Sequence, residues 1–364
     1  MSTPTAGASS TLVEPARPSV LHVLPHPGGG GQTYADTLER IASYQFERIV
    51  LQASETGALP WALITNAARA NMAARRHDLV HVHGEAAAFF ALPGVISCPS
   101  VFTAHGLNLV RRLTGARRRV AESNLRTIVR KAGCSIAVSE IEHDDFLAIV
   151  GDRLADRVVL IRNGVDIPDA PDAGLRARAR AEFWIEEHEF VVAFVGSVKA
   201  VKDPLTAARA AIHAAGDTPV VLLFAGDGEL RPDVEALALE SGGAVRLLGG
   251  RRDVSAVLAA ADAFVLPSRH EGLPYALLEA MARGLPSIVS DRPGCVEVVG
   301  DAGIVVPATD FTAFADAFRR LFSDPSAARV LGERARVRVA TAFSADEQGR
   351  RTQEVYDRVL AARA

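Results

Sequence analysis

Cysteine is scarce in this chain of 364 residues, which contains only Cys98, Cys134 and Cys295. The three thiols stand far apart in the sequence, with no CxxC pair and no Cys/His spacing of the kind that binds zinc. This scarcity argues against a disulfide framework and favours a reducing compartment. We therefore expect a cytoplasmic protein.

Long apolar runs and a large excess of one charge are also absent. No run approaches the roughly 18 apolar residues that span a bilayer, so we expect any membrane association to be peripheral. The formal net charge of −3 argues against a protein that binds nucleic acid. Residues 1–17 lack the basic start and apolar run of a signal peptide, and we expect them to form a disordered lead.

The pattern that is present is an alternation of short runs rich in Val, Ile and Leu with segments of helical periodicity. Such runs are SVLHVL, ERIVLQ, DLVHVH, FVVAFVG, PVVLLFAG, AVRLLGG, DAFVLPS and LPSIVSD. Near-continuous apolar strands separated by helices predict parallel sheets that helices cover on both faces. The alternation pauses at residues 161–174, where Asn-Gly, two prolines and several aspartates are typical of a linker. We expect an α/β protein with two doubly wound domains, residues 18–167 and 168–344.

In such sheets ligands bind at the carboxyl ends of the strands, so the residues that follow each strand are candidates for a site. Gly28 to Gly31 follow the first strand and form a turn without side chains, after which Thr33 is expected to cap a helix. Free backbone amides at a helix start attract phosphate. The run matches neither GxGxxG nor GxxxxGK[ST], and a flexible surface loop is an equally good interpretation.

Two histidines also follow strands, His83 in HVHG and His105 in TAHG. We interpret His83 as mostly structural and His105, which lies between a strand and a glycine, as the better candidate for contacting a ligand hydroxyl. Metal binding by His81 and His83 is not expected. The two side chains share a strand face, but no carboxylate or cysteine partner is nearby in the sequence.

Lys199 and Lys202 lie in the loop after FVVAFVG, and Asp203-Pro204 opens the next helix. A lysine beside the free amides of a helix start suits a diphosphate. The alternative is a solvated surface lysine, which is the commonest environment of that residue.

The segment RHEGLPYALLEA, residues 269–280, places a glutamate at each end of an apolar helix start. Glu271 is expected at the mouth of a cleft, Pro274 at the first helical position, and Glu279 a little over one turn into the helix. A pair of carboxylates can serve as acid and base in glycoside hydrolysis. Beside a phosphate-binding helix start, however, the pair makes better sense as acceptors for sugar hydroxyls, one on each side of a diphosphate.

The same segment resembles the E-x7-E signature of retaining glycosyltransferases of family 4, which have the GT-B fold. The likeness extends over EGLPYALLEAMARGLP and is accompanied by TAHG at 103–106, NGVD at 163–166 and GDGEL at 226–230. The resemblance implies two Rossmann-like domains that face each other across a cleft, with the C-terminal helix, residues 345–364, crossing back to the first domain. It also implies a nucleoside diphosphate sugar as donor and no metal or other cofactor.

The resemblance further implies roles for individual residues. Glu271, as a catalytic residue, would hold hydroxyls of the donor sugar, with His105 reaching that sugar across the cleft, while Glu279 would hold the ribose. Lys202 would contact the diphosphate. The remaining donor contacts implied by the resemblance are Gly30, Gly31, Gly250, Arg251 with Arg252, Gly272, Leu273 and Tyr275.

One position departs from the family pattern. Ser197 stands where the family often has an arginine on the diphosphate, whereas Lys202 is retained. We expect Lys199, two positions along, to supply the missing charge.

The resemblance thus implies transfer of a sugar to an acceptor hydroxyl, in polysaccharide, glycolipid or small glycoside synthesis. The acceptor would be a saccharide, a lipid-linked molecule or a small molecule. Two alternatives stay open: a sugar-nucleotide-binding protein without transferase activity, and a sugar-nucleotide epimerase or hydrolase on the same fold.

Residues 109–133 carry eight basic side chains against one acid, Glu122. Their six apolar residues are enough to anchor a helix on the domain and too few to leave a second apolar surface. One interpretation is contact with an anionic membrane at its inner face, or with a phosphorylated acceptor. The other, with equal weight, is a solvated helix face.

Overall fold

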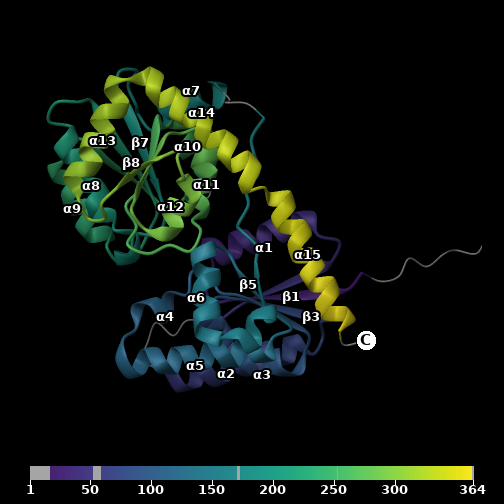
Figure 1. Cartoon of the computed structure of the whole chain (residues 1–364). Coiled ribbons are helices and arrows are strands. Elements are labelled where there is room, and N and C mark those ends of the chain that lie inside the picture. Colours follow the sequence, from purple (N-terminus) through teal and green to yellow (C-terminus); the bar gives the residue numbers. More distant parts are fainter. Residues whose placement is uncertain (1–16, 52–58, 170–172, 252, 363–364) are drawn as a thin grey trace, which may run out of the picture.

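Two six-stranded sheets, one in each half of the chain, form the framework of the protein (Figure 1). The structure is a computed structural model that describes residues 17–51, 59–169, 173–251 and 253–362. The lead expected at residues 1–17 therefore lies, apart from Arg17, outside the described residues. The strand order is β2-β1-β3-β4-β5-β6 in the first sheet and β12-β11-β10-β7-β8-β9 in the second. All of these neighbours pair in parallel, which confirms the expected α/β architecture.

The strands of the first sheet are β1 (Ser19–Leu24), β2 (Gln45–Val50), β3 (Leu79–His83), β4 (Ser100–Thr103), β5 (Cys134–Ala137) and β6 (Val158–Leu160). Those of the second are β7 (Phe190–Val195), β8 (Val220–Ala225), β9 (Val245–Gly249), β10 (Ala263–Leu266), β11 (Ser287–Ser290) and β12 (Ile304–Val306). Every residue of β7, β8 and β10 is buried, as near-continuous apolar runs predict for central strands of a parallel sheet.

The α-helices of the first half are α1 (Gly29–Ile41), α2 (Leu59–Ala74), α3 (Glu85–Ser97), α4 (Asn108–Arg112), α5 (Gly115–Lys131) and α6 (Glu140–Val150). Those of the second half are α7 (Ala173–Glu182), α8 (Pro204–Ala214), α9 (Arg231–Glu240), α10 (Val254–Ala260), α11 (Tyr275–Ala282), α12 (Pro293–Val299), α13 (Phe311–Ser323), α14 (Pro325–Ala342) and α15 (Ala345–Ala361). Two short 3-10 helices cover Asp152–Arg157 and Ala200–Lys202.

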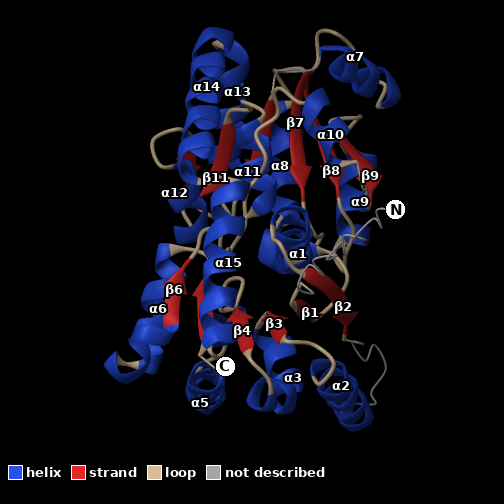
Figure 2. Cartoon of the chain, turned by 90° about the vertical axis from the view of Figure 1, so that its right-hand side faces the viewer, coloured by secondary structure: helices blue, strands red, loops and turns tan. Residues whose placement is uncertain are grey.

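Helices cover both faces of each sheet. Helices α2, α3 and α5 pack on one face of the first sheet, where one apolar cluster forms, and α1 lies on the opposite side (Figures 1 and 2). In the second sheet α8 and α13 pack against one face. A third apolar cluster contains side chains of both halves, among them Tyr34 and Tyr275, so the core continues from one domain into the other.

The C-terminal helix α15 leaves the second half and lies against α1 and β4 of the first (Figure 1). Buried polar contacts fix it there: the Tyr34 hydroxyl lies 2.8 Å from the Thr352 hydroxyl, and His81 Nδ1 lies 2.5 Å from the Tyr356 hydroxyl. The linker is joined to the start of the same helix, because Gly164 N–H donates to the Gln348 side chain at 2.6 Å.

Two expectations about helix starts are wrong. Helix α1 begins at Gly29 with Gly28 as its N-cap, and Thr33 lies inside the helix, where its hydroxyl donates to the Gly29 carbonyl. Gly28 adopts a φ of 81°, which glycine reaches without strain, and the helix cap therefore lies five residues before Thr33. Pro274 is the N-cap of α11 rather than its first residue, because its ψ of 117° is extended.

Within the described residues, no helix combines the length and the apolar character that crossing a bilayer requires.

Candidate active site

The glycine run, Lys202 and Glu271 lie in loops that follow the strands at which the strand order reverses. The reversal lies between β1 and β3 in the first sheet and between β7 and β10 in the second. A crevice opens at such a point, because successive crossover helices depart to opposite faces of the sheet. The glycine run and the two histidines follow strands of the first sheet, while Lys202 and Glu271 follow β7 and β10 of the second.

Glu271 is held in the loop between β10 and α11 by two donors. Lys202 Nζ lies 2.6 Å from Glu271 Oε1, and the Ser268 hydroxyl donates to the same oxygen at 2.5 Å. The Glu271 side chain is only 8% exposed, so this ion pair is shielded from water. Both of these contacts are made by Oε1, and neither engages Oε2.

A second ion pair joins the same two loops. Arg269 Nε lies 3.0 Å from Asp203 Oδ2, and Arg269 N–H donates to the Val201 carbonyl at 2.9 Å. The lysine loop and the glutamate loop are thus one rigid unit. Lys202 can act on a diphosphate while it is still positioned by Glu271.

Glu279 lies on α11, four residues after its first residue Tyr275. Burial raises the pKa of its carboxyl group, and the nearby Arg283 guanidinium partly opposes that rise. Arg283 itself donates to the Glu279 carbonyl at 3.1 Å and to the Ser255 hydroxyl at 2.9 Å. A partly buried carboxylate of this kind is stabilised by hydroxyl groups that donate hydrogen bonds to it.

The two domains touch where these loops meet. A Cβ added to Gly272 would lie 2.9 Å from Gly106 Cα, so the Glu271 loop and the His105 loop are in backbone contact. Arg111 of α4 donates to the Glu271 carbonyl at 3.3 Å. The Asn163 amide of the linker donates to the carbonyl of Leu273, which is itself buried, at 2.7 Å.

The glycine run forms part of the same boundary. A Cβ on Gly30 would lie 3.7 Å from the ring of Tyr275, and one on Gly31 would lie 3.7 Å from the ring of His105. Helix α1 therefore begins beside the start of α11. Gly31 packs against His83, whereas Gly28 to Gly30 are exposed, so the run is in part a surface turn at the boundary between the domains.

His105 is the end of a chain of imidazoles. Its Nε2 lies 3.0 Å from His83 Nδ1, and His83 Nε2 lies 2.8 Å from His22 Nδ1. Burial lowers the pKa of His22 and His105 to about 3 and that of His83 well below its usual value. All three rings are therefore neutral near pH 7, and the tautomer of each fixes that of the next. His83 is structural, as expected, and it orients His105.

His22, His81 and His83 also form the one group in the described part of the chain whose spacing would suit a metal ion, with their ligand atoms within 4.8 Å of one another. Reasoning from the sequence missed His22, which comes from β1. Both nitrogens of His81 already face hydroxyl groups, the Tyr356 hydroxyl and the Thr103 hydroxyl at 2.8 Å. The geometry therefore supports hydrogen bonding among these rings better than metal ligation.

A buried carboxylate holds the His105 loop in place. Glu142 accepts hydrogen bonds from Gly106 N–H and, at 2.6 Å, from Val138 N–H. His105 itself has a φ of 58°, a conformation that is uncommon outside glycine. Burial raises the pKa of Glu142 to about 7.

This pKa predicts a pH dependence of stability. The carboxyl group binds its proton more tightly in the folded chain than in the unfolded chain, whose pKa is near 4.5. The free energy of unfolding should therefore decrease as the pH rises from 4.5 to 7, by ~3 kcal/mol from this group. Urea denaturation of the wild type and of Glu142→Gln across that range would measure the difference. Burial also raises the pKa of Glu85 and Glu279, so some pH dependence of the free energy of unfolding should remain in Glu142→Gln. A pH dependence equal to that of the wild type would contradict the assignment to Glu142.

The remaining candidates lie in the second domain. Ser197 is half-buried and Lys199 exposed in the loop after β7. The chain contains only three lysines among its 40 basic residues, and two of them, Lys199 and Lys202, are in this loop.

Gly250 and Arg251 follow β9. The Arg251 guanidinium lies 4.9 Å from the centre of the Phe183 ring and 2.7 Å from Glu182. Its side chain is thus engaged within its own domain, and only the backbone is left for the proposed contact with a base. Arg252 lies outside the described residues.

Four residues that shape the site were not predicted from the sequence: Ser268, Arg111, Glu142 and His22. Ser268 had a usable signal, because it ends a predicted strand three residues before Glu271. The others act through contacts between segments far apart in the chain, which no local pattern indicates.

Comparison with known proteins agrees with this arrangement. Residues 20–168 match the family described as Glycosyltransferase Family 4, and residues 189–324 match that described as Glycosyl transferases group 1. The alpha-maltose-1-phosphate synthase of Mycolicibacterium smegmatis is 32% identical over 72% of this chain and 74% of its own length. The D-inositol 3-phosphate glycosyltransferase of Salinispora arenicola is 32% identical over 81% of this chain and 72% of its own length.

Solved structures of other proteins have the same fold as this chain. HepE of Anabaena, crystallised with UDP and glucose, superposes with a TM-score of 0.78 at 17% identity, over 94% of this chain and 99% of its own. Sucrose-phosphate synthase of Thermosynechococcus elongatus gives a TM-score of 0.74 at 22% identity, over 95% and 100%. The chain is thus a member of the family 4 (group 1) glycosyltransferases and has the GT-B fold.

Proposed function

We propose that the chain is a metal-independent, retaining hexosyltransferase that moves a sugar from a nucleoside diphosphate donor to an acceptor hydroxyl. The observation that carries this proposal is the position of Glu271, held by Lys202 at 2.6 Å and by Ser268 beside the His105–Gly106 loop. Oε2 of Glu271 accepts hydroxyls of the donor sugar, and Glu279 accepts those of the ribose.

Charge develops on the leaving diphosphate as the glycosidic bond breaks. Lys202, Lys199 and the amides at the start of α11 stabilise that charge, so the proposed reaction needs no metal. Retention follows when the acceptor attacks from the face that the diphosphate leaves, with a diphosphate oxygen taking the proton of the acceptor hydroxyl. The neutral His105 ring, oriented by His83, contributes a hydrogen bond rather than a charge.

Relatives support a role in polysaccharide, glycolipid or small glycoside synthesis. An Escherichia coli protein that is 26% identical over 77% of this chain is a galactosyltransferase whose acceptor is a diphosphoundecaprenol-linked sugar. The Salinispora arenicola relative is named a glycosyltransferase of D-inositol 3-phosphate, a small molecule. We propose a donor of the UDP-, GDP- or ADP-sugar type for this chain.

A thermal-shift screen of UDP-, GDP- and ADP-sugars, followed by assays of nucleotide release, tests this function. We expect one donor class to raise the melting temperature and release to require an acceptor. Release without an acceptor would indicate a hydrolase. Donor binding with no release at all would indicate a binding protein.

Lys199 is expected to replace the charge that Ser197 does not supply. Lys199→Ala should lower kcat/KM about tenfold or more, because one charged contact to the diphosphate is lost, and Ser197→Arg should restore much of it. Steady-state kinetics of the single and double variants measure the coupling. Arg329→Ala, at an exposed site on α14, is the matched control. No loss in Lys199→Ala, or no rescue, would remove Lys199 from the site.

We further propose that residues 109–133 hold this cytoplasmic enzyme at the inner face of an anionic membrane. Arg117, Arg118 and Arg119 are all exposed at the start of α5. At ~1 kcal/mol for each basic residue, replacing the three by serine should weaken binding to anionic vesicles about a hundredfold at low salt. Co-sedimentation with anionic and neutral vesicles measures this, with Arg350→Ser/Arg351→Ser as control. Equal sedimentation with both kinds of vesicle would support the alternative that α5 only presents a solvated charged face.

A further inference from the structure

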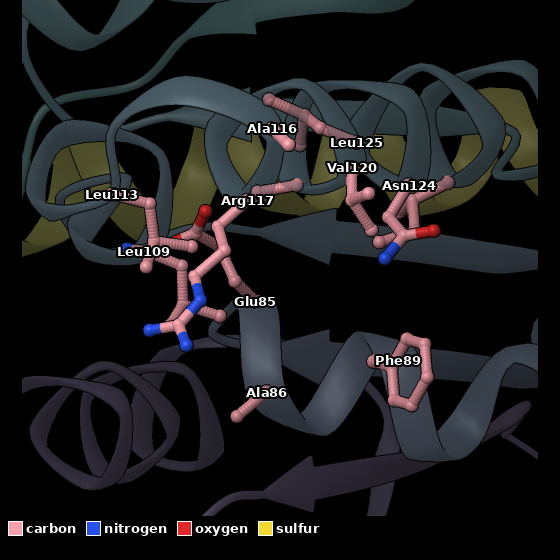
Figure 3. Close-up of a pocket in the computed structure, with 12 residues that line it drawn as sticks. Glu85, Ala86, Phe89, Leu109, Leu113, Ala116, Arg117, Val120, Asn124 and Leu125 are labelled. Atoms are coloured by element: carbon pink, nitrogen blue, oxygen red, sulfur yellow. The ribbon is translucent and has the colours of Figure 1, made fainter.

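An apolar groove runs along the first domain between α3 and the α4–α5 pair (Figure 3). Its volume is about 540 Å³, within the range of small-molecule sites. Twelve residues line it, and only Glu85, Arg117 and Asn124 among them are polar. The groove is thus built to hold hydrocarbon.

Large apolar side chains in the groove remain exposed to solvent. Phe89 of α3 is 50% exposed, Leu109 of α4 45%, and Val120 of α5 61%. The expectation that residues 109–133 leave no second apolar surface is therefore wrong. Leu125, Ile128 and Val129 are the buried residues of α5, whereas Val120 of α5 and Leu109 of α4 remain exposed. Apolar side chains that gather at one exposed hollow mark a binding surface.

Positive charge borders the hollow at one end. Figure 3 shows the Arg117 side chain at the end where Glu85 and Leu109 lie, with Asn124 and Phe89 toward the other. Arg118 pairs with Glu122 at 2.9 Å, whereas Arg117 and Arg119 form no ion pair with another described residue. An apolar hollow whose lining includes one arginine without an ion-pair partner among the described residues, Arg117, is complementary to a molecule with a hydrocarbon chain and an anionic head.

The charged end of the groove also adjoins the active-site cleft. The Glu85 carboxylate accepts a hydrogen bond from Leu109 N–H at 2.7 Å, which ties α3 to α4. Two residues along α4, Arg111 reaches the Glu271 carbonyl. A chain lying in the groove would therefore have its head at the side where the donor sugar is held.

We propose that this groove binds the hydrocarbon chain of the acceptor, and that the acceptor is an anionic lipid whose head-group hydroxyl enters the cleft. The proposal rests on the proposed function, since there is an acceptor only if the enzyme transfers a sugar. A water-soluble saccharide would leave Leu109 and Val120 exposed to water, and contact with phosphate groups alone would need no hollow.

Monomeric butyl, octyl and dodecyl phosphate test the groove without any donor or turnover. Titration calorimetry should show at least tenfold tighter binding of dodecyl than of octyl phosphate to the wild type, because each further methylene leaves water. Val120→Asp should remove most of that dependence. Val337→Asp on α14 should retain the dependence on chain length, because Val337 does not line the groove. It is a matched control, since Val337 is 63% exposed and Val120 61%.

Equal affinity of the wild type for butyl and dodecyl phosphate would overturn the proposal, and this result does not require Val120→Asp to fold. If Val120→Asp folds, an affinity that depends on chain length as strongly as in the wild type would also overturn the proposal. Self-association that Val120→Asp abolishes, without binding of alkyl phosphate, would assign the groove to a second copy of the chain.

Transfer to alkyl glycosyl phosphates then separates an acceptor from a lipid that only anchors the enzyme. We expect kcat/KM to rise at least tenfold from butyl to dodecyl acceptors in the wild type and in Val337→Asp, and to stay flat in Val120→Asp. Chain-dependent binding with chain-independent transfer would overturn the assignment to the acceptor. Donor binding without transfer to any acceptor would instead contradict the proposed function.

Discussion

Replacing Glu271 by glutamine is expected to lower kcat/KM for sugar transfer about a hundredfold, while the affinity for the free nucleoside diphosphate stays nearly unchanged. Glutamine keeps the shape of the side chain but not its charge. In the variant the amide oxygen still accepts a hydrogen bond from Lys202, which keeps that lysine in place for the diphosphate. The charge-assisted bond to the donor sugar, which the free nucleotide lacks, is lost. Steady-state kinetics and titration calorimetry with the nucleoside diphosphate measure the two effects separately.

Glu279→Gln is expected to affect nucleotide binding more than sugar transfer, the opposite of Glu271→Gln. Its carboxylate is partly buried and lies one turn into α11, so its loss should weaken binding of the nucleoside diphosphate about tenfold or more. Transfer should decrease largely through that weaker binding. Glu333→Gln, an exposed site on α14, is a control for glutamate replacement in general. If Glu271→Gln weakened affinity for the free nucleotide as much as Glu279→Gln does, the division of roles would be wrong.

The fold could be predicted because its signal is local. Each apolar run forms a strand, and each turn between a run and a helix lies at the edge of a sheet where ligands bind. The runs around 190–196 and 262–268 became β7 and β10, and the loops that follow them carry Lys202 and Glu271. The strands at Ile304–Val306 and Val158–Leu160 have three residues each, too short to stand out from the apolar helices around them.

The sequence did not reveal contacts that depend on how the domains pack. Gly272 and Gly106 are 166 residues apart, and nothing local to either indicates that their backbones touch. The imidazole chain behind His105 depends likewise on β1 and β3 being neighbours, a pairing that periodicity does not specify. For α5 the apolar residues were identified correctly, but their number alone could not show which side chains are buried.

A second large effect on sugar transfer is expected from the contact between the Gly272 loop and the Gly106 loop. Gly272→Ala should lower kcat/KM about tenfold to a hundredfold, because its Cβ would lie 2.9 Å from Gly106 Cα and 3.0 Å from Gly106 N. A backbone atom cannot turn aside as a side chain does, so the loops that carry Glu271 and His105 must separate.

The measurement is kcat/KM beside the melting temperature. We expect a small change in the latter, because each domain has its own sheet and the strain falls on the contact between them. Gly216→Ala is the matched control: its added Cβ would have the His213 carbonyl oxygen at 3.6 Å as its nearest neighbour, an ordinary contact. Wild-type kcat/KM in Gly272→Ala would show that the closed contact is not the catalytic arrangement. Loss of activity that follows loss of folded protein would show that the contact maintains the fold rather than the geometry of transfer.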